Sequence, residues 1–128
     1  MGFWIFMTLM TLLTPVTMLL LGRRFFLRPP ERINGAFGYR TARSMKNKDT
    51  WDFAHRCCGR AWFRWGLAMA LLSLLVMALL INRGLEEVGA AGLALVLAQL
   101  FPLIGTIFTT ERALKRTFDD FGLRREGR

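Results

Sequence analysis

Three apolar runs dominate the pattern of the chain, and a long polar segment separates the first two. The runs cover residues 2–21, 61–81 and 89–108. Each is about 20 residues long, the length that an α-helix needs to cross a hydrocarbon core of about 30 Å. We therefore predict an all-α integral membrane protein in which three transmembrane helices form a single membrane domain, residues 1–128.

Three polar segments connect or follow these runs. They are a long loop at residues 22–60, a short turn at 82–88 and a charged tail at 109–128. At the end of the long loop we predict an interfacial helix that leads into the second run, with Asn47 or Asp49 as its cap. Leu114 and Phe118 give the tail a partial amphipathic face, which predicts a short helix on the membrane surface.

Positive charge is concentrated in the long loop and just after it. Residues 22–64 hold eleven Lys/Arg and three Asp/Glu, nearly all of the chain's net charge of +9. Basic residues beside membrane-spanning segments stay on the cytoplasmic side. We therefore predict a cytoplasmic loop and carboxyl terminus, with the amino terminus outside. Charges in this position suit anionic lipid headgroups, and we expect no nucleic-acid partner.

A few polar side chains lie inside the apolar runs. Thr11 and Thr14 share one helical face around Pro15, and Gln99 lies within the third run. A threonine face can pack on a neighbouring helix or line a polar ligand pathway. We favour packing, with Gln99 bonding this face inside the membrane. Small residues that allow close helix approach recur in the third run at Ala90, Ala94 and Ala98.

The chain has few residues that could carry catalysis or bind a metal. His55 is the single histidine, and Cys57 and Cys58 are the two cysteines. Asp52, His55 and Cys58 are spaced so that neighbours could touch on one helix. Nucleophilic sites instead bring their members together from separate elements, and a metal site usually needs four ligands. We therefore predict no enzymatic activity, no metal and no cofactor.

The composition of the long loop favours a binding site. Gly35 and Gly38 permit backbone conformations that are closed to other residues. The donor-rich residues near them are Asn34, Tyr39, Arg40, Thr41, Arg43, Lys46 and Asn47. With Trp51 and His55 on its membrane side, such a cluster suits a phospholipid headgroup, a peptide carboxylate or an acidic protein segment. The alternative interpretation is that the basic residues only anchor and orient the chain.

An ordered series of residues of unrelated types runs from the loop into the second apolar run. They are Ile33, Gly35, Gly38-Tyr39-Arg40-Thr41, Ser44-Met45-Lys46-Asn47, Thr50-Trp51, Ala54-His55-Arg56 and Gly59-Arg60. This order resembles the signature of the SdpI/YfhL family of small bacterial integral membrane proteins. The resemblance implies a multi-pass protein of the bacterial inner membrane. It also implies immunity against a membrane-active peptide toxin, or envelope signalling by a receptor that holds a transcriptional repressor at the membrane.

Two other functions stay open at this point. One is an oligomeric lipid-binding or small-solute transport protein, since three helices are too few to enclose a path alone. The other is a structural accessory subunit of a larger membrane complex. The partners that these functions call for are anionic lipids, a peptide toxin, a cytoplasmic regulatory protein and further copies of the chain.

Overall fold

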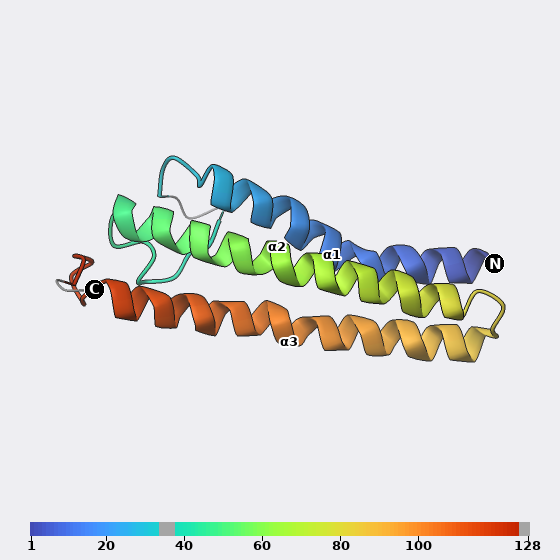
Figure 1. Ribbon diagram of the computed structural model, residues 1–128. Helices are drawn as coiled ribbons and strands as arrows, with labels where there is room; N and C mark the ends of the chain where they lie inside the picture. Colours follow the sequence, from blue (N-terminus) through green and yellow to red (C-terminus); the bar gives the residue numbers. More distant parts are fainter. Residues whose placement is uncertain (34–37, 126–128) are drawn as a thin grey trace.

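The computed structural model describes residues 1–33 and 38–125, and they form three long helices. The helices are α1 (Gly2–Leu27), α2 (Lys48–Leu79) and α3 (Leu85–Thr117). They lie side by side and alternate in direction (Figure 1). The amino terminus and the turn at residues 80–84 meet at one end of the bundle, the turn end. The described parts of the loop, residues 28–33 and 38–47, and the tail at residues 118–125 meet at the other, the loop end.

The helices confirm an all-α protein built to span a membrane. Each is long and apolar enough to do so, and only 17–28% of the residues in their apolar windows are buried inside the bundle. The remaining apolar side chains face outward, where lipid is the medium that accepts them. At about 1.5 Å per residue, the 32 residues of α2 and the 33 of α3 extend about 48–50 Å. They are therefore longer than a hydrocarbon core of about 30 Å.

The helices extend past the apolar runs at the loop end. α1 continues to Leu27 and stops just before Pro29 and Pro30, because a proline disfavours helical backbone at the residue before it. The interfacial helix is the first part of α2 itself, and Asn47 is its cap. Residues 109–117 continue α3 instead of forming a separate surface helix, since Leu114 is buried in the bundle.

Glycines let α1 and α2 approach until their backbones touch. A Cβ added at Gly59 would lie 2.5 Å from the carbonyl oxygen of Gly22, and one added at Gly22 would lie 2.7 Å from that of Gly59. Nearer the middle of the membrane, a Cβ at Gly66 would lie 2.8 Å from the Pro15 carbonyl oxygen. Each of these positions therefore requires glycine.

A polar contact joins all three helices near the middle of the bundle. Pro15 has no N–H, so the carbonyl of Thr11 lacks its usual helical donor. The Gln99 side-chain amide of α3 donates to that carbonyl oxygen at 2.7 Å and to the Ser73 hydroxyl of α2 at 3.1 Å. Gln99 thus bonds the backbone of the threonine face and restores a hydrogen bond that the proline removes.

The small-residue stripe of α3 faces away from the bundle. Ala90, Ala94 and Ala98 are all exposed, so they do not bring α3 close to α1 or α2. At Gly92 the end of the Met7 side chain of α1 occupies the space where a Cβ would lie.

Candidate functional site

The loop is fastened to α2 through His55. The backbone N–H of Tyr39 donates to His55 Nε2 at 2.8 Å, and His55 Nδ1 lies 2.8 Å from the Trp51 carbonyl oxygen. Because Nε2 accepts a hydrogen bond, the proton of the neutral ring sits on Nδ1. Gly38 has a φ of 110°, and an added Cβ would collide with Nε2. The turn therefore requires glycine both for its backbone angle and for the space beside the ring.

A second fastening holds the start of the loop. The indole nitrogen of Trp51 donates to the Pro30 carbonyl oxygen at 2.8 Å, and the Lys48 amine donates to the same oxygen at 3.2 Å. Trp51 and His55 are both fully buried, with their ring centroids 4.3 Å apart. These two side chains thus position the loop from within, and neither lies on an accessible surface.

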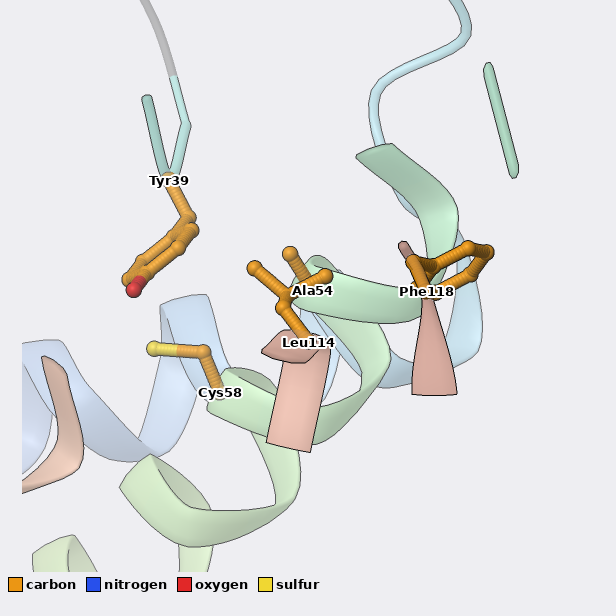
Figure 2. Packing of buried hydrophobic residues seen from close by; sticks show 5 residues of the cluster. All are labelled: Tyr39, Ala54, Cys58, Leu114 and Phe118. Carbon is orange, nitrogen blue, oxygen red and sulfur yellow. The ribbon is translucent and has the colours of Figure 1, made fainter. Parts of the chain in front are cut away.

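Tyr39 connects the loop to α3. Its hydroxyl donates to Glu111 Oε1 at 2.7 Å, and the Ile107 carbonyl oxygen lies 3.3 Å away. Burial and the Glu111 carboxylate both raise the pKa of the Tyr39 hydroxyl above its ordinary value of 10, so the hydroxyl stays protonated and keeps donating. Figure 2 shows the Tyr39 ring extending from the loop toward Cys58 of α2, in the buried cluster that Ala54, Leu114 and Phe118 complete.

Ion pairs and caps close the loop against the tail. Arg43 lies 4.0 Å from the Glu111 carboxylate and 3.8 Å from that of Asp120. Asn47 caps α2 in a reciprocal pair with Thr50, and its side-chain amide donates to the Gly122 carbonyl oxygen at 2.7 Å. Many donors of the predicted cluster are therefore engaged within the chain.

A cavity of about 360 Å³ remains beneath the loop. Its lining comes from the loop and all three helices: Gly38, Tyr39, Arg40, Thr41, Leu21, Phe25, Cys58, Trp62 and Ile107. The wall is mostly apolar, with Arg40 and Thr41 at the loop side. The Trp62 indole nitrogen donates to Thr106 Oγ1 at 2.9 Å, which fixes the ring between the helices.

A second hollow of about 370 Å³ continues from this cavity along α1 and α3. It shares Leu21 and Trp62 with the first and is also lined by Leu13, Thr14, Thr17, Met18 and Leu103. Thr14 and Thr17 therefore line this second hollow, whereas Thr11 is buried beside Gln99. We call the two hollows together the α1/α3 groove.

The structure separates the predicted site residues into two groups. Gly38, Tyr39, Arg40 and Thr41 line the cavity. Arg43, Asn47, Trp51 and His55 hold the loop in place. Lys46 is exposed, and Asn34 and Gly35 lie outside the described residues.

Sequence reasoning missed the helix residues that complete the cavity. It also missed Glu111, which accepts the hydrogen bond of Tyr39 in the cavity wall. A signal for it exists, because Glu111 is the only acid between Glu87 and Asp119 and lies three residues after the end of the third apolar run. Such an isolated carboxylate beside a membrane segment calls for a partner. That partner is the Tyr39 hydroxyl.

The row of Asp52, His55 and Cys58 does not form a connected set. Both ring nitrogens of His55 are engaged by backbone groups, and the Asp52 carboxylate is 2.8 Å from the Lys48 amine. Cys58 is buried in the apolar cluster with Tyr39. The geometry of these three residues therefore lacks the nucleophile-to-base hydrogen bond that a catalytic row requires.

Comparison with known proteins identifies the chain's relatives. The sequence model described as the SdpI/YfhL protein family matches residues 31–110, from the loop through most of α3. The uncharacterized protein YfhL of Bacillus subtilis (strain 168) is 32% identical over 115 residues, which cover 87% of this chain and 91% of that protein. No solved structure matches the chain. With the family match spanning more than half of its length, this multi-pass membrane protein belongs to the SdpI/YfhL family.

Proposed function

We propose that this protein protects its cell against a membrane-active peptide by binding it, not by catalysis. The α1/α3 groove carries the proposal, because its apolar walls lie between two membrane helices and its loop end bears Arg40 and Tyr39. A peptide dissolved in the bilayer could enter such a groove sideways, with apolar side chains along the helices and a polar end at the loop.

Membership of the family supports this proposal, since the resemblance described above implies immunity against a secreted peptide. We place the loop end in the cytoplasm of a bacterial inner membrane, because positive charge is concentrated there. The half-buried Cys57 tests this orientation. A membrane-impermeant maleimide should label Cys57 in inverted vesicles and leave it unlabelled in intact cells. Labelling in intact cells would place the loop end outside.

The loop could also report occupancy of the groove to a cytoplasmic regulatory protein. Tyr39 forms part of the cavity wall and bonds Glu111, and Arg43 lies between Glu111 and Asp120 of the tail. A ligand that displaces the Tyr39 ring would therefore loosen the contacts that hold the tail. Hydrogen exchange of residues 118–125 should then rise when peptide binds. Unchanged exchange in a saturated sample would exclude this relay.

Protection of living cells tests the proposed function. A sensitive bacterium expressing the chain would be challenged with a panel of purified membrane-active peptides, with inhibitory concentration and membrane depolarisation as readouts. We expect the wild type to raise the inhibitory concentration of at least one peptide. Leu21→Trp, which fills the groove where its two hollows meet, should abolish this protection.

The matched control is Leu71→Trp, which makes the same change on an exposed position of α2 outside the groove. It should protect as the wild type does, with equal amounts of both variants in the membrane. Full protection by Leu21→Trp would contradict binding in the groove. Failure of the wild type against the whole panel would contradict the immunity function itself.

A further inference from the structure

A second concave surface lies on α2, separate from the α1/α3 groove. It encloses about 670 Å³ and includes three arginines, Arg56, Arg60 and Arg64, beside Phe53, Cys57 and Ala61. We call this surface the arginine groove. It shares no lining residue with the cavity beneath the loop, so a ligand here would not compete directly with one bound under Tyr39.

The acids at the outer end of the arginine groove are already neutralised. Asp49 accepts two hydrogen bonds of 2.8 Å from the guanidinium of Arg124. Asp52 forms an ion pair of 2.8 Å with Lys48. Among the residues that the structure describes, the three groove arginines form no hydrogen bond or ion pair with the protein. The groove therefore presents three unneutralised positive charges to its surroundings.

The position of the arginines along α2 indicates the level of the membrane surface. Arg64 is the last charged residue before an uncharged stretch that continues to Asn82. Its neighbour Trp65 is 49% exposed, as is typical of aromatic residues at a bilayer interface. Arg60 and Arg56 follow toward the loop end at steps of about 6 Å along the helix axis. The groove therefore begins at the headgroup level.

Beyond Arg64, toward the turn end of the bundle, the exposed surface of α2 is apolar. Leu67 and Leu71 follow it on the same side of α2, at three and seven residues, and they are 46% and 60% exposed. Guanidinium groups next to lipid-facing leucines match the two parts of a phospholipid, its phosphate and its acyl chains. A soluble phosphate compound would use only the charged half of this surface.

We propose that the arginine groove binds an anionic phospholipid of the surrounding bilayer. The guanidinium groups of Arg56, Arg60 and Arg64 hold the headgroup phosphate, since their planar donors suit phosphate oxygens. The acyl chains lie along Leu67 and Leu71. The bound lipid neutralises the charge of this face and fixes the depth at which α2 sits in the membrane.

Lipid retention by the purified full-length chain tests this proposal. Native mass spectrometry would compare dioleoyl phosphatidylglycerol with dioleoyl phosphatidylcholine, which carries no net charge. We expect the wild type to retain phosphatidylglycerol preferentially. The triple variant R56Q/R60Q/R64Q should bind it about tenfold more weakly or worse.

A matched triple variant controls for the loss of charge alone. R112Q/K115Q/R116Q also removes three positive charges, but from exposed positions near the end of α3. This variant should retain phosphatidylglycerol as the wild type does. Equal retention by the groove variant, or an equal loss in the α3 variant, would overturn the site. Displacement of the lipid by millimolar glycerol 1-phosphate would overturn the choice of a bilayer ligand.

Folding of the groove variant is checked before its lipid binding is interpreted. If the triple variant is not monodisperse, the single variant Arg60→Gln replaces it, since Arg60 is the middle charge of the three and is exposed. A clear loss of preference for phosphatidylglycerol in this single variant supports the site, and an unchanged preference contradicts it. Neither outcome depends on protection against peptides, so the lipid site and the proposed immunity function fail or stand separately.

Discussion

The two ends of the bundle are held together in different ways. At the loop end, α1 and α2 touch through the backbones of Gly22 and Gly59, and hydrogen bonds from His55 and Trp51 fasten the loop. At the turn end, residues 80–84 reverse the chain between α2 and α3. The contacts there come from single side chains, such as the Trp4 indole nitrogen, which donates to the Met77 carbonyl oxygen at 2.7 Å.

This difference shows where the chain specifies its geometry most closely. A backbone contact between glycines tolerates no added atom, whereas a side-chain contact can adjust its rotamer. The loop end also holds the cavity beneath Tyr39, so the region with the strictest packing surrounds the candidate site. The turn end needs apolar length and a short reversal, which many sequences can supply.

The largest effect is expected from Gly59→Ala. The added Cβ would lie 2.5 Å from the Gly22 carbonyl oxygen and 2.8 Å from the Phe26 backbone nitrogen, so α1 must move away as a whole. We expect a loss of about 3 kcal/mol of stability, measured as thermal unfolding in detergent. The matched change Gly105→Ala meets nothing within 4 Å and should leave stability equal or higher. Equal stability of Gly59→Ala and the wild type would contradict the glycine contact.

A medium effect, confined to the loop end, is expected from His55→Ala. It removes the acceptor of the buried Tyr39 N–H, at a cost of about 2 kcal/mol. Hydrogen exchange of residues 38–46 should accelerate, while the turn end exchanges as before. His55→Gln is the control, because its side-chain oxygen can accept the same hydrogen bond and should restore part of the protection. Unaltered loop exchange in His55→Ala would show that this bond does not hold the loop.

The smallest effect is expected from Gln99→Leu, outside the loop end. It leaves the Thr11 carbonyl without the donor that compensates for Pro15, at a cost of about 1 kcal/mol. The unfolding midpoint should fall slightly with no change in loop exchange. Leu97→Ala, an exposed change on the same helix, should have less effect. Faster loop exchange in Gln99→Leu would mean that the two ends are not independent.

The sequence predicts the helices because lipid imposes a length on apolar runs. The polar residues before the second run also predict Asn47 or Asp49 as a cap, and Asn47 caps α2. The extension of α1 past its apolar run is not predicted, because it depends on contacts between helices. Phe25 and Phe26 extend α1 past its apolar run through edge-to-face contacts with His55 and Phe63, with ring centroids 4.9 Å and 5.8 Å apart. No hydropathy pattern records such pairs, and only the prolines after Leu27 indicate where the helix must stop.

For the candidate site, too, the sequence predicts the segment but not the contacts between elements. Composition pointed to the loop, and four of its residues line the cavity. It could not tell Tyr39, which forms part of that wall, from His55, which only holds the turn, because both are polar aromatic residues in one segment. Both side chains are buried, and they differ in their contacts. The Tyr39 hydroxyl reaches Glu111 and Ile107 of α3, whereas both ring nitrogens of His55 meet backbone groups.

Photo-crosslinking in the membrane tests the central claim, that a peptide is held in the α1/α3 groove at the loop end. A diazirine analogue of leucine, which leaves the side-chain volume almost unchanged and so does not fill the groove, would replace Leu21 or, as the control, the lipid-facing Leu71 of α2. Cells would then be illuminated with a labelled peptide against which the chain protects them. We expect a crosslink to the peptide from position 21 and none from position 71. Equal crosslinking from both positions, or none from position 21 in a chain that still protects, would contradict this account.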